Sequence, residues 1–103
     1  MNQLTESCAL RKQTDLVCIA FLETDIDLAF TFLRLAAAEI RGGKAAHASQ
    51  LMEKAILAHK TVIKEVDNLS VELAEEKCEL HEHTQRLWEA IVSSLHDLES
   101  LPR

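Results

Sequence analysis

The chain of 103 residues has few of the residues that interrupt regular structure, with only two glycines and one proline. It has no tyrosine, just 4% aromatic residues, and no Asn-Gly or Asp-Gly pair that would mark a tight hairpin, so the signals for β-strands are weak. Hydrophobic residues make up 48% of the chain, too many for a disordered protein. Alanine, leucine, glutamate and lysine, which favour helices, are abundant instead. The composition predicts a single all-α domain.

Cysteine is scarce as well. The three cysteines, Cys8, Cys18 and Cys78, are odd in number and too widely spaced for a disulfide framework, which favours a reducing cytoplasm. No apolar run approaches the ~20 residues that a transmembrane helix needs. The short run after Arg11-Lys12 ends in acidic residues and has no cleavage site for a signal peptidase. We therefore expect a cytoplasmic protein with no membrane contact.

Basic residues are outnumbered, and the formal net charge is −6. From Val71 to the end of the chain, eight acidic residues stand against three basic ones. Such an excess repels phosphate groups, so nucleic acids and anionic membranes are not expected partners. We interpret the acidic end as a solvated helix face. The alternative is an acidic adaptor or inhibitor that binds a basic partner.

Apolar residues at a spacing of three and four predict three long helices. Residues 1–13 form an N-terminal tail or a short extra helix. The first long helix is expected over about residues 16–41, after an N-cap at Thr14-Asp15. A break at Thr24-Asp25 is the competing interpretation.

Gly42-Gly43 should end the first helix, because glycine adopts the left-handed conformation at a helix C-terminus without steric cost. A second helix is expected over about residues 44–68, and a third begins near Ser70 and ends before Pro102. Residues 14–103 are therefore predicted to form one antiparallel three-helix bundle with an up-down-up arrangement. The second helix carries a strict stripe of core residues at alternating spacings of four and three: Ala48, Met52, Ala55, His59, Val62, Val66 and Leu69.

The first helix has more apolar residues than one core stripe requires. Leu28, Phe32 and Leu35 lie off its main face. A helix that is apolar on several sides is either central in its bundle or covered by another molecule. We therefore expect these three residues to form an interface, with self-association as a dimer as the favoured outcome and a separate protein partner as the other.

The hairpin of the first two helices combines small and large residues in a recognisable pattern. Its members are Phe32, Leu35, Ala36, Gly43, Ala48, Met52 and Ala55, with the ending Glu53-Lys54-Ala55-Ile56. With these residues the hairpin resembles a tetratricopeptide repeat, from which it departs at Glu39, where an aromatic residue is usual, and at Lys60, where a proline normally stops the helix. A single hairpin followed by a third helix is also similar to the microtubule-interacting and transport domain, over residues 25–99. Both resemblances imply a binding module.

One cluster has the side chains of metal ligands. Cys78, His81 and Glu82 share one face of the third helix, at positions i, i+3 and i+4. A structural zinc site needs four ligands, and His59 of the second helix is the candidate for the fourth. A metal-binding or redox-sensing protein is thus an alternative function. We otherwise expect His59 to be a core histidine with its polar atoms satisfied.

No motif of an enzyme is present. The chain has no Gly-x-Ser-x-Gly, no glycine-rich phosphate loop and no Glu-x-x-His pair for a di-iron site. We therefore expect a non-enzymatic interaction module that needs no cofactor.

Overall fold

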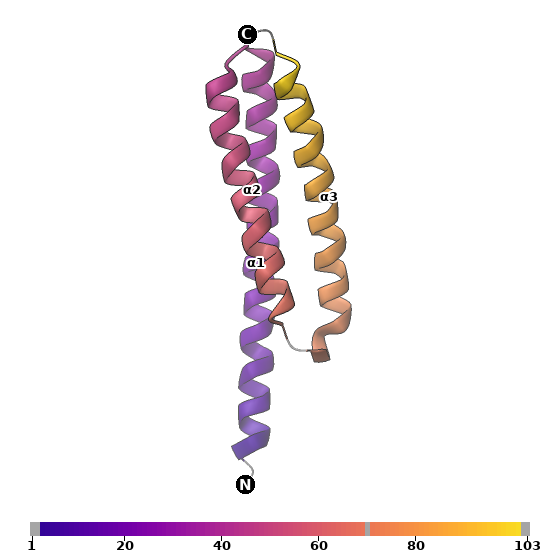
Figure 1. Cartoon of the computed structure of the whole chain (residues 1–103). Coiled ribbons are helices and arrows are strands. Elements are labelled where there is room, and N and C mark those ends of the chain that lie inside the picture. Colours follow the sequence, from indigo (N-terminus) through magenta and orange to yellow (C-terminus); the bar gives the residue numbers. More distant parts are fainter. Residues whose placement is uncertain (1–2, 70, 102–103) are drawn as a thin grey trace.

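The computed structural model describes the backbone of residues 3–69 and 71–101 and the side chains of residues 14–69 and 72–101. Its helices are α1 (Gln3–Arg41), α2 (Ala45–Asp67) and α3 (Ala74–Glu99), and a 3₁₀-helix, η1 (Val71–Leu73), precedes α3. The three long helices run up, down and up (Figure 1). Within the described residues there is no strand. The predicted all-α three-helix bundle is confirmed.

The first helix begins earlier than predicted. It starts at Gln3 and continues without interruption to Arg41, so the predicted start near residue 16 with a cap at Thr14-Asp15 is wrong, and the alternative break at Thr24-Asp25 does not occur. The first turns of α1 extend past the ends of the other two helices (Figure 1). As a result the molecule measures 68 × 18 × 15 Å, which is elongated for a chain of this size.

The N-terminal segment was predicted to be a tail or a short helix. From Gln3 on, its backbone is the first part of α1, while residues 1–2 lie outside the described residues. The division of the chain into an N-terminal segment over 1–13 and a bundle over 14–103 stays a prediction.

The turn between α1 and α2 closes as the two glycines predict. Gly43 has a φ of 73°, in the left-handed region that glycine enters most easily. Its amide donates to the carbonyl of Ile40 at 3.0 Å, and the amide of Lys44 donates to the carbonyl of Glu39 at 2.8 Å. These two bonds make a Schellman motif, so two carbonyls in the last turn of α1 are satisfied and the chain reverses within three residues.

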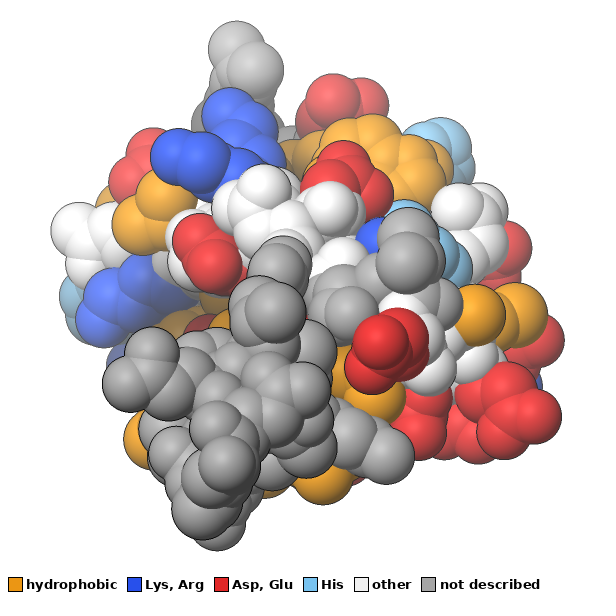
Figure 2. All heavy atoms as spheres, turned by 90° about the horizontal axis from the view of Figure 1, so that it is seen from below, with side chains coloured by type: hydrophobic (Ala, Val, Ile, Leu, Met, Phe, Trp, Pro, Cys, Tyr) orange, Lys and Arg blue, Asp and Glu red, His pale blue; other side chains and the backbone are white. Residues whose placement is uncertain are grey.

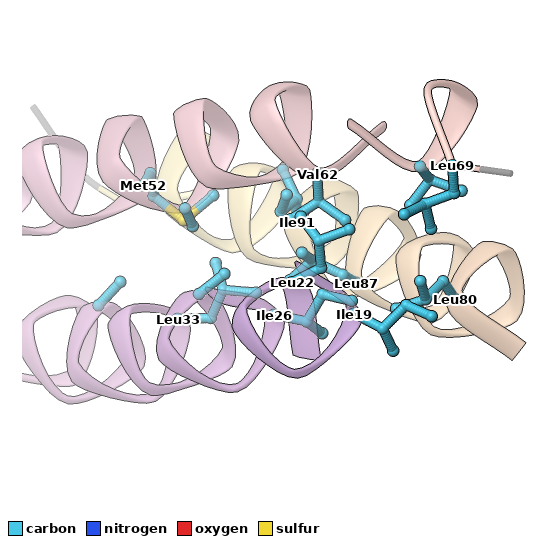
Figure 3. Packing of buried hydrophobic residues seen from close by; sticks show 14 of the residues in the cluster. Ile19, Leu22, Ile26, Leu33, Met52, Val62, Leu69, Leu80, Leu87 and Ile91 are labelled. Atoms are coloured by element: carbon cyan, nitrogen blue, oxygen red, sulfur yellow. The ribbon is translucent and has the colours of Figure 1, made fainter. Parts of the chain in front are cut away.

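Alanines line the contact between α1 and α2. Ala29 and Ala36 of α1 and Ala48 and Ala55 of α2 have no exposed surface, and small side chains let two helix backbones approach closely. Larger residues fill the seam on either side, and Figure 3 shows side chains from all three helices converging there. Every member of the stripe predicted on α2, from Ala48 to Leu69, is buried.

The third helix completes the core with Leu80, Leu87 and Ile91, all fully buried. Two polar residues interrupt its core stripe, and both are satisfied. Lys77 donates from Nζ to the carbonyl of Leu69 at 3.3 Å, and Thr84 donates from its hydroxyl to the carbonyl of His81 at 2.8 Å.

The third helix begins at Ala74, without a side-chain cap. Ser70, near which its start was predicted, lies outside the described residues. Trp88 and Val92 of α3 keep 42% and 48% of their surface exposed. None of the helices in the described part of the chain has the length and hydropathy that a bilayer crossing requires.

The Schellman turn gives a test of the hairpin. Replacing Gly43 with alanine should lower the free energy of unfolding by about 1 kcal/mol, because a residue with a Cβ is strained at positive φ. A Cβ at Gly42 would lie 3.6 Å from the nearest carbonyl oxygen, in ordinary contact. Gly42→Ala is therefore the matched control and should be neutral or slightly stabilising. Urea unfolding of both variants measures the difference, and equal midpoints would contradict the assigned turn.

Candidate interaction surface

The three predicted interface residues on α1 are placed differently by the structure. Leu28 and Leu35 are 47% and 50% exposed. Phe32 is half-buried and packs against the core, and the Nζ atom of Lys54 in α2 lies 5.6 Å from the centre of its ring. Leu28 and Leu35 therefore belong to an open surface, while Phe32 lies at its edge, beside α2. Their role as an interface stays a prediction.

Two further apolar residues of α1 extend this surface toward the N-terminus. Val17 and Phe21 are 54% and 68% exposed, and sequence reasoning missed both. Together with the exposed positions between them they form a line along α1 that we call the outer stripe. Its members are Val17, Phe21, Thr24, Leu28, Thr31, Leu35 and Ala38, all exposed.

The outer stripe has the spacing of a helix that pairs with another helix. Its members follow one another at alternating intervals of four and three residues, which is the heptad pattern. At 100° per residue the stripe lies about 150° around α1 from the core residues such as Ile26 and Leu33. The signal was present in the sequence, as the repeat of Phe21, Leu28 and Leu35 every seven residues.

The two threonines of the outer stripe add little polarity to it. The hydroxyl of Thr24 donates to the carbonyl of Ala20 at 3.0 Å, and that of Thr31 donates to the carbonyl of Asp27 at 3.1 Å. Because both hydroxyls are satisfied by the backbone of their own helix, they do not require water or a partner's polar group. The outer stripe is thus an apolar surface along roughly 30 Å of helix.

A second, more polar surface lies between α2 and α3. His59 is buried, with 8% of its surface exposed, and its ring centre lies 5.1 Å from that of Trp88. Both residues line a shallow groove of about 430 Å³ with Ile63 and His81. Burial lowers the pKa of His59, and a hydrogen bond to the backbone of Thr84 opposes this shift. The expectation that His59 lies in the core is confirmed by its burial.

The cysteines have different surroundings. Cys18 packs against the core, and burial raises the pKa of its thiol, with smaller contributions from the carboxylates of Glu65 and Asp15. A raised thiol pKa disfavours the reactive thiolate. Cys78 is free and exposed. The side chain of Cys8 lies outside the described residues.

The predicted ligand cluster on α3 is not brought together as a metal site. Cys78, His81 and Glu82 are all exposed. Cys78 and His81 line a shallow pocket of about 390 Å³ with Ala74 and Lys77. Within residues 14–69 and 72–101, no three His, Cys, Asp or Glu side chains are placed to hold a metal ion. The metal or redox alternative gains no support from this arrangement.

Acidic side chains lie together near the start of α3, as the excess of acidic residues after Val71 predicts. Viewed from the end of the bundle where α3 begins, Figure 2 shows acidic side chains on the side on which α3 lies in Figure 1. The exposed acids at this end include Glu72, Glu75, Glu79 and Glu82. All four face solvent, as on an ordinary solvated helix. An acidic adaptor that binds a basic partner remains an alternative prediction.

Comparisons with known proteins identify no relative. No family model, no curated protein and no solved structure matches this chain. Of the resemblance to tetratricopeptide repeats and to the microtubule-interacting and transport domain, the three-helix arrangement is what the structure supports.

The shifted pKa of His59 predicts how stability depends on pH. Since the folded chain holds this pKa below its ordinary value of 6.5, the unfolded chain takes up the proton more readily. The free energy of unfolding should therefore fall as the pH is lowered below about 6.5. Urea unfolding at pH 7.5 and pH 5.5, at one protein concentration, measures this loss.

The contribution of His59 can be separated from that of the other histidines. We expect His59→Leu to lose less stability than the wild-type chain between the two pH values. His96→Leu, at an exposed position of α3, is the control and should keep the wild-type dependence. The same pH dependence in the His59 variant and the wild type would contradict the assignment.

Proposed function

We propose that this chain is a non-enzymatic protein interaction module that associates with itself through the outer stripe of α1. The observation that carries the proposal is the continuous line of exposed apolar side chains on that helix. Large contiguous apolar patches on the surface of a protein usually mark an interaction site. Isolated exposed apolar residues are ordinary, but four large ones on one face of one helix are not: Val17, Phe21, Leu28 and Leu35.

The form of the surface supports a helix as its partner. The outer stripe is narrow and has a seven-residue repeat, whereas a small-molecule site is concave. A helix that already buries one face against α2 and α3 has no structural need for a second apolar face. The outer stripe of an identical chain offers such a helix, and closed two-fold dimers are the commonest oligomers.

A single substitution on the outer stripe tests the proposal. Leu28→Asp should convert a dimer into a monomer, because it places a charge in the middle of an apolar contact. Leu28 is 47% exposed, so the variant should keep its helix content and unfolding midpoint as a monomer. Light scattering on a sizing column, with reductant present, measures the molar mass against the chain mass of 11.6 kDa.

The matched control is Leu57→Asp. Leu57 is 65% exposed but lies on α2, away from the outer stripe, so this variant should remain a dimer. Phe32 is a poorer choice for a charged substitution because it is half-buried beside the core. A wild-type chain that stays monomeric at high micromolar concentration would contradict self-association.

A further inference from the structure

Between Phe21 and Ala38, large and small residues divide the outer stripe into two sets. The large side chains Phe21, Leu28 and Leu35 recur every seven residues, and the small side chains Thr24, Thr31 and Ala38 recur at the same interval between them. Two helices pack well when large residues of one face small residues of the other. In a parallel pair each residue faces its own copy, so layers of two large side chains alternate with layers of two threonines. In an antiparallel pair the two sets face each other.

We infer that the partner is a second copy of this chain, lying antiparallel on the outer stripe with its two-fold axis at the level of Ala29 and Phe30. This inference rests on the proposed self-association and specifies its geometry. Each layer then joins one large and one small residue from different copies. The facing pairs are Phe21 with Ala38, Leu28 with Thr31, and Leu35 with Thr24.

Charges beside the outer stripe favour the same alignment. Asp27 and Arg34 flank it seven residues apart, at equivalent positions of α1, and both are exposed. Asp27 lies toward α3, where it lines a pocket with His83 and Arg86, and the described residues give neither Asp27 nor Arg34 an ion pair. In an antiparallel pair, flanking positions of this kind face each other across the interface. With the axis at Ala29 and Phe30, Asp27 of each copy faces Arg34 of the other. The two-fold symmetry makes this attraction occur twice.

Antiparallel alignments that are shifted by seven residues bring like charges together. A shift of the antiparallel pair by one heptad sets Asp27 opposite Asp27 of the second copy, or Arg34 opposite its own counterpart. Facing like charges are unfavourable and commonly exclude wrong alignments of paired helices. The residue sizes therefore favour the antiparallel orientation, and the charges select one register within it.

A parallel alignment would also bring one pair of opposite charges together, but the structure argues against that pair. Parallel helices would set Arg34 against Glu39 of the second copy, five residues further along. Glu39 already lies within its own hairpin, with its Oε2 atom 3.5 Å from Nδ1 of His47 in α2, and it is half-buried. Its carboxylate is thus turned toward α2 rather than held free for a second chain.

Two charge reversals test the geometry without touching an apolar residue. Arg34→Glu makes both flanking positions acidic, and Asp27→Arg makes both basic, so each variant should dimerise roughly tenfold or more weakly than the wild-type chain. Mixed together, the two variants should pair with each other, because each acidic flank then faces a basic one. Sedimentation velocity over a range of concentrations gives the dissociation constants of the separate and mixed proteins.

The expected result is a mixture that dimerises more tightly than either variant alone. Lys60→Glu is the matched control: it changes the net charge as Arg34→Glu does but lies at an exposed position of α2, so it should dimerise as the wild type does. A mixture with an affinity between those of the two variants would overturn the antiparallel register. Restoration of the Arg34→Glu dimer by Glu39→Arg in the same chain would instead show a parallel pair.

The outcome also separates this inference from the proposed function. If Leu28→Asp yields a monomer while neither charge reversal changes the dimer, the outer stripe is the interface and the register is wrong. If the wild-type chain is monomeric throughout the concentration range, the second copy is excluded as the partner and both proposals fail. Circular dichroism of each variant confirms that the helices are retained.

Discussion

The close contact of α1 with α2 along four buried alanines is the constraint on which the rest of this molecule depends. Ala29, Ala36, Ala48 and Ala55 are fully buried, so the two backbones approach one another and the Schellman turn at Gly43 holds the approach at one end. Because these small residues leave little apolar surface to bury, larger side chains must close the seam. The third helix supplies them, with Leu80, Leu87 and Ile91.

This hairpin also explains why one face of α1 is left open. A helix in the centre of a larger bundle is covered on all sides. Among the described elements, α1 packs against α2 and α3 alone, and both lie on the same side of it. Its outer stripe consequently faces away from the core. In a three-helix protein with a 39-residue first helix, this second apolar face belongs to the exposed surface rather than to the core.

Much of the fold was predictable because residue spacing alone determines which helix face is buried. The stripe from Ala48 to Leu69 and the end of α1 at Gly42-Gly43 were predicted correctly. The start of α1 was not, because Thr14-Asp15 resembles a cap although helix formers precede it. For the surface, the sequence showed an apolar surplus at Leu28 and Leu35. Only the structure separated the half-buried Phe32 from them and added Val17 and Phe21, since exposure depends on where the neighbouring helices lie.

The contact between His59 and Trp88 has a practical consequence for the study of this protein. Trp88 is the only tryptophan of the chain, and its ring centre lies 5.1 Å from that of the histidine on the neighbouring helix. Its fluorescence is therefore a native probe of the distance between α2 and α3. Trp88 is 42% exposed in the folded chain, and separation of these two helices exposes the rest of the indole to water, which shifts its emission to longer wavelength. The opening of the bundle on that side is thus visible without any added label.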